Sequence, residues 1–219
     1  MNTEIQKFLK EQFVSEIGFT TCPETPFPGL RNTVSMVFHL SEAVVDQITD
    51  KPTHTYFHHY RTMNAHIDAV SMRLVLFLQE KGYRAAAVPA SQSTEGLSGI
   101  FSHKMAAVRA GLGYIGKSCL FISNGFGPRV RLGTVFTDAP LETVSFSQKS
   151  ACGTCDACAK ACGAMAIRNV NFEEGMERED IFDARACSDY MKEKFKHIGR
   201  GAVCGVCMKV CPKGARGQK

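Results

Sequence analysis

The sequence predicts an α+β protein in two parts, an α/β domain over residues 1–145 and a small cysteine-rich domain over residues 146–219. Three observations predict this fold class. Helix-like and strand-like segments alternate up to residue 137, a polar stretch with a proline covers residues 138–150, and eight of the ten cysteines fall in the last 68 residues. With 219 residues and 44% hydrophobic content, the chain can form one sizeable core and a smaller second domain.

The first domain is expected to open with an amphipathic helix, because five apolar side chains recur at helical spacing over residues 3–17. Prolines within residues 23–28 predict a loop. The apolar run 33–40 predicts a buried strand, and a short helix to Ile48 follows it. Pro52 then interrupts the chain before the next element.

A long helical pattern runs from about residue 56 to 81 and ends at Gly82, which suits the left-handed position after a helix. Residues 84–89 predict a strand, and residues 90–102 form a polar loop that contains glycine and serine. A short helix is expected over residues 103–110.

Strands are expected near residues 120–123 and 130–137, joined by the glycine-rich turn 124–128. The second domain contributes one helix, over residues 183–196. The polar stretch 138–150 reads as the linker between the two domains.

The cysteines of the second domain follow the spacing of a protein that binds two iron–sulfur clusters. The first run is Cys-x2-Cys-x2-Cys-x3-Cys, and the second is a lone cysteine, a 16-residue gap and then Cys-x2-Cys-x3-Cys-Pro. Thiolates suit iron–sulfide cores, and in two-cluster ferredoxins the fourth cysteine of such a run ligates the other cluster. This rule assigns Cys152, Cys155, Cys158 and Cys211 to the first [4Fe–4S] cluster, and Cys162, Cys187, Cys204 and Cys207 to the second.

Structural zinc and disulfides are the alternatives for these cysteines. Zinc sites also use Cys-x2-Cys pairs, but they take four ligands in two such pairs, which leaves the further cysteines surplus. Disulfides are disfavoured because no secretory signal precedes them and the N-terminus reads as an ordinary helix. Cys22 and Cys119 read as small buried residues, since all eight ligand positions are filled without them.

Charge and hydropathy limit the class of partner. The net charge of +5 permits docking to an acidic protein or a nucleic acid but requires neither. No basic sequence with interleaved aromatic residues points to RNA, which argues against tRNA. No apolar run approaches the roughly 20 residues that span a bilayer, so we expect no membrane association and a cytoplasmic location. An external low-potential electron donor is the expected partner of two such clusters.

A second motif is the glycine loop Gly111-x-Gly113-x2-Gly116. As a string it matches the dinucleotide-binding fingerprint, but that fingerprint follows a strand and opens a helix. Here a helical segment precedes the loop and a strand-like segment follows it. The glycines therefore indicate tight turns or a close approach of the backbone to another group. A group of histidines at positions 54, 58, 59 and 66 reads as polar helix surface or pocket lining.

Taken together, these motifs resemble the epoxyqueuosine reductase family of cobalamin-dependent iron–sulfur enzymes, which are related to reductive dehalogenases. Residues 105–118 (MAAVRAGLGYIGKS) look like the family's AGLGWIGKN segment. Residues 131–138 (RLGTVFTD) are similar to its LGEIFTD strand, and the cysteine region, including residues 183–187 (DARAC), completes the likeness. The likeness covers roughly residues 28–212.

The resemblance implies a nitroreductase-like α/β domain that holds base-off cobalamin beside a ferredoxin-like module, with electrons passing through the clusters to cobalt. It places the corrinoid against residues 103–118. The implied contacts are Lys104, Gly111, Gly113, Tyr114, Gly116 and Lys117. Flavin is the alternative cofactor, because nitroreductase-like folds commonly hold it.

The catalytic acid of the family is the main departure. Its proton-donating Asp lies in a motif resembling Arg-Asp-Tyr-His, and the matching residues 62–66 (TMNAH) place Asn64 at that position. An amide cannot act as a general acid, so His66, whose ordinary pKa lies near neutrality, is the candidate replacement. The N-terminal region is also shorter than in the family, and the helical extension of longer members does not follow Cys211.

Two functions remain open from the sequence. The first is a reductase that passes single electrons through the clusters to a bound corrinoid and on to a substrate. The second is a non-catalytic electron-transfer or reactivation partner of another corrinoid or redox protein, which the amide at Asn64 favours.

Overall fold

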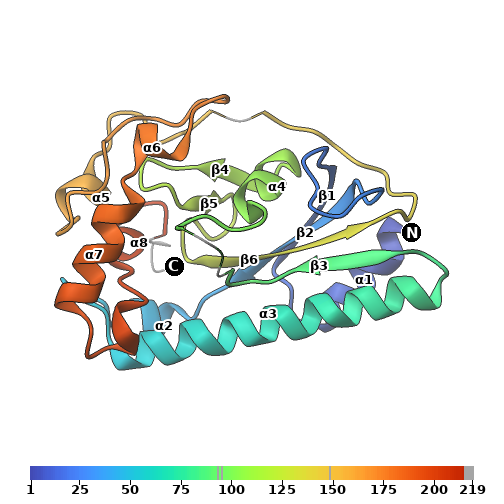
Figure 1. The fold of residues 1–219 in the computed structure, drawn as a ribbon, viewed down its shortest axis with the longest axis horizontal. Coiled ribbons are helices and arrows are strands. Elements are labelled where there is room, and N and C mark those ends of the chain that lie inside the picture. Colours follow the sequence, from blue (N-terminus) through green and yellow to red (C-terminus); the bar gives the residue numbers. More distant parts are fainter. Residues whose placement is uncertain (93, 95, 148, 215–219) are drawn as a thin grey trace. The chain divides into compact units, whose positions relative to one another are not determined.

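The computed structural model describes residues 1–92, 94, 96–147 and 149–214 (Figure 1). The chain divides into two compact units. Unit 1 comprises residues 1–39, 63–113 and 131–147. Unit 2 comprises residues 40–62 and 114–130 together with the described residues from 149 onward. The cysteine region therefore groups with two segments from the first 145 residues, while the predicted boundary at residues 145 and 146 stays a prediction.

Unit 1 is built on a four-stranded sheet with the order β1-β2-β6-β3. The strands are β1 (Glu16–Thr21), β2 (Asn32–His39), β3 (Ala85–Val88) and β6 (Val130–Thr137). β1 pairs with β2 in antiparallel register, with Gly18 opposite Ser35, and β3 pairs with β6, also antiparallel, with Val88 opposite Thr134. The strands predicted over residues 33–40, 84–89 and 130–137 are confirmed.

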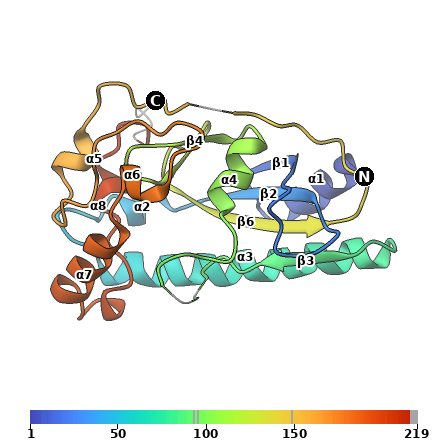
Figure 2. The same ribbon diagram turned by 45° about the horizontal axis from the view of Figure 1, so that its top comes forward.

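Helices cover the two faces of this sheet (Figures 1 and 2). α3 (His54–Glu80) packs its buried side chains against Val135 of β6, and α4 (His103–Arg109) contributes Ala106 to a second cluster that contains Phe136. Val135 and Phe136 are neighbours in one strand, and neighbouring side chains point to opposite faces of a sheet. The two helices therefore lie on opposite faces. The long helix predicted over residues 56–81 is confirmed, and Gly82 takes the predicted left-handed conformation, with φ +85°.

The predicted N-terminal helix is correct at its start and wrong at its end. α1 spans Asn2–Glu11, with Ile5 and Leu9 buried, whereas Ile17 lies in β1. Phe13 has φ +61°, in the left-handed region, and this turns the chain out of the helix. Ile17 satisfied the helical period by coincidence, because a single apolar residue fits both helical and strand spacing.

Replacing Leu74 with alanine is expected to lower the free energy of unfolding by about 2–5 kcal/mol, because a buried leucine side chain leaves a cavity when it is truncated. Leu74 is fully buried in the core beneath the sheet, within the part of α3 that belongs to unit 1. Urea denaturation followed by circular dichroism measures the change. Met72→Ala on the same helix is the control, because Met72 is 54% exposed; equal losses for the two variants would contradict the packing.

Unit 2 contains little regular structure. It has the two-stranded β4 (Gly113–Ile115) and β5 (Phe121–Ser123) ladder, to which Gly113 of unit 1 contributes, and α2 (Glu42–Val45). The remaining elements are short helices: α5 (Ala157–Lys160), α6 (Arg178–Ile181), α7 (Ala184–Lys194), α8 (Val206–Lys209) and a 3-10 turn at Gly199–Gly201. The helix predicted over residues 183–196 is confirmed as α7. Such short elements bury few apolar side chains, so bound metal is expected to supply part of the folding free energy of this unit.

Ion pairs tie the 40–62 segment to the cysteine segment. Asp46, which follows α2, accepts hydrogen bonds from Arg129 at 3.0 Å and from Lys209 of α8 at 2.6 Å. Arg129 also pairs with Glu42. The two acids are partly exposed, so each pair stabilises the fold only modestly, and their main effect is to orient α2 relative to α8. No helix among the residues that the structure describes is long and apolar enough to cross a membrane.

Candidate metal centres and cofactor residues

The eight cysteines within residues 152–211 lie on short helices and on the turns before and after them. Asp183 caps the N-terminus of α7 by accepting a hydrogen bond from the backbone N–H of Ala186 at 2.9 Å, which places Cys187 in the first turns of this helix. Cys158 lies in α5 and Cys207 in α8. The remaining five lie next to these helices, at positions Cys152, Cys155, Cys162, Cys204 and Cys211.

Four of the cysteines are mutual neighbours although one of them is distant in sequence. The pKa of the Cys158 thiol is raised by burial and by the charges of Cys152 and Cys211. The pKa of Cys211 is raised by burial and by Cys152 and Cys155. Cys211 therefore lies with the first three cysteines of the first run.

The other four cysteines form a second group. Burial raises the pKa of Cys187 to about 11, with further contributions from Cys204 and Cys162. The pKa of Cys207 is raised by burial and by Cys204, Cys187, Cys162 and, most weakly, Cys158. The fourth cysteine of the first run thus groups with Cys187, Cys204 and Cys207. The weak contribution of Cys158 to Cys207 indicates that the two groups are adjacent.

The chemistry of these two groups fits iron–sulfur clusters. Metal binding requires thiolates, whereas burial and the charges of neighbouring cysteines raise the pKa of five of these thiols and favour their protonated form unless a cation compensates the charge. The five are Cys158, Cys187, Cys204, Cys207 and Cys211. Within the described residues, no three His, Cys, Asp or Glu side chains are arranged to hold a single metal ion. A cluster does not need such convergence, because each thiolate binds a different iron of the cluster.

Backbone groups contact the cysteines as well. The N–H of Ala166 donates to Sγ of Cys162 at 3.4 Å, the type of hydrogen bond that stabilises negative charge on a sulfur ligand. Between Cys204 and Cys207, Gly205 takes φ +83° at the start of α8. A β-carbon there would lie 2.8 Å from Cδ1 of Ile48, so glycine is required for both its conformation and its size.

The second half of the predicted cofactor loop lies against the first group of cysteines. A β-carbon at Gly116 would lie 3.0 Å from Cγ1 of Ile122 and 3.4 Å from Sγ of Cys152. Tyr114 is only 8% exposed, and burial together with the charges of nearby cysteine thiols raises its pKa to about 12. Lys117 is 4% exposed, and its Nζ donates to Oδ1 of Asn169 at 3.1 Å.

The first half of the loop belongs to unit 1. Lys104 is half-buried on α4, and Gly111 follows this helix with φ +74°. A β-carbon at Gly111 would lie 2.7 Å from Cδ2 of Phe146. Gly113 begins β4, so the loop follows a helix and continues into a strand. A dinucleotide fingerprint has the opposite order, strand, loop and helix, so the structure argues against it, as the sequence predicted.

These surroundings bear on the corrinoid contacts implied by the resemblance. Side chains of the protein itself fill the spaces beside Gly111 and Gly116. Phe146 lies beside Gly111, and Ile122 and Cys152 lie beside Gly116. A β-carbon at either position would meet these groups, so glycine suits both. Lys104, Gly111, Gly113, Tyr114, Gly116 and Lys117 stay predicted contacts.

The predicted catalytic residues lie on α3. Asn64 is 8% exposed, and its Oδ1 accepts a hydrogen bond from Nε of Arg131 at 2.9 Å, while Nη2 of Arg131 donates to the carbonyl of Ala90 at 3.1 Å. His66 is half-buried, with its imidazole edge-on to Phe38 at 5.6 Å between ring centroids. The amide of Asn64 is therefore a partner of a guanidinium group, and His66 stays a predicted proton donor.

Sequence reasoning missed Arg131 and the polar side chains linked to it through the backbone of residues 89–90. Nδ1 of His103 lies 2.7 Å from Oγ1 of Thr134, and its Nε2 lies 3.0 Å from the carbonyl of Pro89. Oδ1 of Asp68 accepts from the N–H of Ala90 at 2.8 Å. Asp68 follows Asn64 by one helical turn, and this spacing could have identified it from the sequence. No sequence signal predicts the polar groups that other elements contribute.

Replacing Asn64 with leucine is expected to lower the free energy of unfolding by about 1–3 kcal/mol, because the Nε–H of Arg131 loses the buried oxygen to which it donates. Asn64→Asp is the control, since a carboxylate can accept the same hydrogen bond and is expected to be tolerated. Thermal and urea unfolding of the two variants measure the difference. Equal stability of Asn64→Leu and the unaltered protein would show that the contact with Arg131 does not stabilise the fold.

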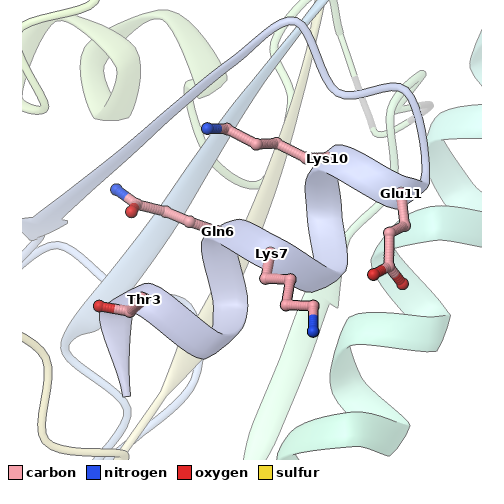
Figure 3. A pocket seen from close by; sticks show the side chains of 5 residues that line it. All are labelled: Thr3, Gln6, Lys7, Lys10 and Glu11. Atoms are coloured by element: carbon pink, nitrogen blue, oxygen red, sulfur yellow. The ribbon is translucent and has the colours of Figure 1, made fainter.

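A shallow depression of about 480 Å³ lies on the solvent-facing side of α1. It is lined by Thr3, Gln6, Lys7, Lys10 and Glu11 (Figure 3). The five side chains come from one helix and spread apart, and they do not converge on a common point. We therefore assign no ligand to this depression.

Comparison with known proteins supports the interpretation of the cysteine region. Residues 151–214 match the family model of the 4Fe-4S double cluster binding domain. A tetrachloroethene reductive dehalogenase of Dehalobacter restrictus is 32% identical over 157 residues, which cover 65% of this chain and 26% of that protein. A solved epoxyqueuosine reductase from Bacillus subtilis superposes with a TM-score of 0.63 at 21% identity, covering 97% of this chain and 65% of that one.

A solved reductive dehalogenase, whose structure suggests a mechanism for B12-dependent dehalogenation, superposes with a TM-score of 0.66 at 18% identity and covers 93% of this chain and 30% of that one. Homologues of the chain thus include reductive dehalogenases and epoxyqueuosine reductases, and the resemblance inferred from the sequence is confirmed. The chain spans about a quarter of the length of the reductive dehalogenases that it matches.

Proposed function

We propose that the chain is an iron–sulfur oxidoreductase that passes single electrons through two [4Fe–4S] clusters to a bound corrinoid, for reduction of a substrate. The observation that carries this proposal is the sorting of eight cysteines into two interleaved groups of four, with one member of each group supplied by the other run. The match of residues 151–214 to a double-cluster domain supports the same assignment.

Each part of the chain has a defined task under this proposal. The clusters supply one-electron transfer at low potential. The cysteines bind them in two adjacent sites, the N–H of Ala166 supports negative charge at Cys162, and Asp183 fixes the helix that carries Cys187. The first cluster takes Cys152, Cys155, Cys158 and Cys211, and the second takes Cys162, Cys187, Cys204 and Cys207.

The corrinoid part of the proposal rests on the relatives. A solved dehalogenase with the same fold is associated with B12-dependent dehalogenation. The proposed contacts are Lys104, Gly111, Gly113, Tyr114, Gly116 and Lys117. The nitroreductase-like identity of the sheet-containing unit belongs to the same proposal. Flavin is the alternative cofactor for that unit. An external low-potential donor delivers the electrons, and a cytoplasmic location suits such a donor.

Anaerobic reconstitution with iron, sulfide and cobalamin tests both parts. We expect about eight irons per chain, from two clusters of four, and one corrinoid per chain that stays bound through gel filtration. A visible spectrum separates corrinoid from flavin in the same sample. Full iron loading without any corrinoid affinity would remove the corrinoid part and leave the electron-transfer part standing.

A second candidate function is delivery of electrons to another corrinoid or redox protein, without a substrate of its own. The hydrogen bond between Asn64 and Arg131 favours it, because the position of the family's acid is an amide that accepts from a cation. An aspartate at this position would also be held ionised by Arg131, and would be a poor proton donor near neutral pH. Turnover of a small halogenated or epoxide substrate by the isolated, reduced protein would contradict this candidate.

A further inference from the structure

The hydroxyl group of Tyr114 is buried and has no hydrogen-bond partner within the described part of the chain. The residue lies in β4 and is 8% exposed. Buried polar side-chain atoms are nearly always hydrogen-bonded to protein or to another bound group, so an unpaired phenol calls for a partner that the polypeptide does not provide.

The direction of the strand shows where that partner lies. Side chains two positions apart in an extended segment point to the same side. Gly116 is two positions after Tyr114, and a β-carbon at Gly116 would point to within 3.4 Å of Sγ of Cys152. Ile115, between them, points the other way and is buried. Tyr114 therefore faces the first group of cysteines.

The electrostatic surroundings agree with this direction. After burial, the groups that raise the pKa of Tyr114 are Cys152, Cys211 and Cys155, three of the four proposed ligands of the first cluster. None of the cysteines assigned to the second cluster contributes. The phenol thus lies beside the proposed ligands of the first cluster.

We propose that the Tyr114 hydroxyl donates a hydrogen bond to a sulfur atom of the first cluster, a sulfide or a ligand thiolate, and so raises the reduction potential of that cluster. The inference rests on the proposed binding of two clusters. One-electron reduction adds one negative charge to the cluster, and a donor at sulfur stabilises the more negative state. The hydroxyl stays protonated throughout and no bond is broken. The phenol is a positioning and tuning group.

The ring of Tyr56 lies beside Gly205, between two proposed ligands of the second cluster, but among the described residues Tyr114 is the one tyrosine with a buried hydroxyl that lacks a hydrogen-bond partner. Tyr190 is the aromatic residue on α7, and its ring packs edge-on to Phe195 with centroids 5.5 Å apart. Its oxygen would lie 2.4 Å from a β-carbon at Gly163, so Tyr190 fills space against the backbone next to Cys162. The hydroxyl of Tyr114 therefore distinguishes the two clusters, and the effect of its removal is expected to be confined to the first.

Replacing Tyr114 with phenylalanine tests the proposal, because it removes the hydroxyl and keeps the ring. Reconstituted protein is reduced stepwise with titanium(III) citrate and followed by electron paramagnetic resonance, with Cys187→Ser protein identifying the signal of the first cluster. At a fixed potential we expect the reduced-to-oxidised ratio of the first cluster to fall three- to tenfold, where tenfold corresponds to about 59 mV for one electron. The second cluster is expected to keep its potential.

Tyr83→Phe is the matched control, since Tyr83 packs against the core of unit 1 and neighbours none of the cysteines in the described contacts. It is expected to leave both potentials unchanged. An unchanged first potential in fully loaded Tyr114→Phe protein would overturn the inference and leave the proposed function intact. Loss of corrinoid affinity without a shift in potential would also overturn it, because the hydroxyl would then serve the corrinoid. Unaltered protein that binds no cluster would overturn both.

A second measurement covers the case in which Tyr114→Phe does not retain the first cluster. Incorporation of 3-fluorotyrosine at all five tyrosines changes the size of each side chain little and makes each phenol a stronger hydrogen-bond donor. The first potential is then expected to rise above that of the unlabelled protein, while the second is unaffected. Equal first potentials for labelled and unlabelled protein would contradict the hydrogen bond.

Discussion

Cys158→Ser and Cys211→Ser are expected to remove the same cluster, although the two cysteines lie 53 positions apart. Cys162→Ser, only four positions after Cys158, is expected to remove the other cluster. The reason is spatial. Cys158 has Cys211 as a neighbour, whereas Cys162 neighbours Cys187, Cys204 and Cys207.

Iron and sulfide analysis together with electron paramagnetic resonance measures this result. Each single variant is expected to hold about four irons per chain in place of about eight, and the remaining signal identifies the surviving cluster. The double variant Cys158→Ser/Cys211→Ser is expected to match either single variant, because both cysteines serve one site. Cys22→Ala is the control, since Cys22 is buried in unit 1 and should leave both clusters intact. Loss of the same signal from the Cys158 and Cys162 variants would refute the interleaved assignment.

Replacing Gly201 with alanine is expected to destabilise unit 2 by about 2–4 kcal/mol and to weaken the second cluster. Gly201 has φ +72°, and a β-carbon would lie 2.5 Å from the carbonyl oxygen of Met191 and 2.7 Å from Cα of Lys192. Both are backbone atoms of the C-terminal part of α7, so the clash cannot be relieved by rotating a side chain. The strain falls on the connection between Cys187 and Cys204, two proposed ligands of one cluster.

Gly175→Ala separates the two causes of this loss. Gly175 also has a positive φ, +90°, but nothing lies within 4 Å of a β-carbon at that position. The Gly175→Ala variant therefore has the conformational strain without the steric clash. Its free energy of unfolding is expected to fall by about 1 kcal/mol, and both clusters are expected to be retained. Urea unfolding of the loaded proteins and the rate of iron release to a chelator are the measurements. Similar losses in the two variants would show that backbone contact at Gly201 is unimportant.

The parts of the fold that the sequence predicts are those with a strong local pattern. The long helix ending at Gly82, the apolar strands β2 and β6, and the helix capped by Asp183 all follow from spacing and capping chemistry within one segment. The end of α1 was wrong because Ile17 is compatible with both a helix and a strand, and pairing of β1 with β2 decides between them. Local periodicity does not contain that pairing.

In the candidate sites, too, features with a local sequence pattern could be predicted, and contacts between distant residues could not. Cysteine spacing and a rule about such runs suffice to group eight ligands, because the chemistry of the site dictates the spacing. The partners of Asn64 and Lys117 could not be found in this way. Arg131 and Asn169 lie 67 and 52 positions away from them, and only the folded chain brings these polar atoms within hydrogen-bond distance. The segments 40–62 and 114–130 likewise join unit 2 through contacts between residues far apart in sequence.

Interleaving of the cysteine groups has a consequence for the biosynthesis of the holoprotein. If each cluster takes a ligand from both runs, neither site exists on a nascent chain until the second run has been synthesised, at Cys207 for one cluster and Cys211 for the other. Cofactor loading then waits for synthesis of the second run, and the thiols of the first run stay without their full ligand set until that point. Each cluster, once inserted, closes a loop of several tens of residues and restrains the unfolded ensemble as a covalent crosslink does. Maturation and folding of this region are thereby one event, governed by the supply of iron and sulfide.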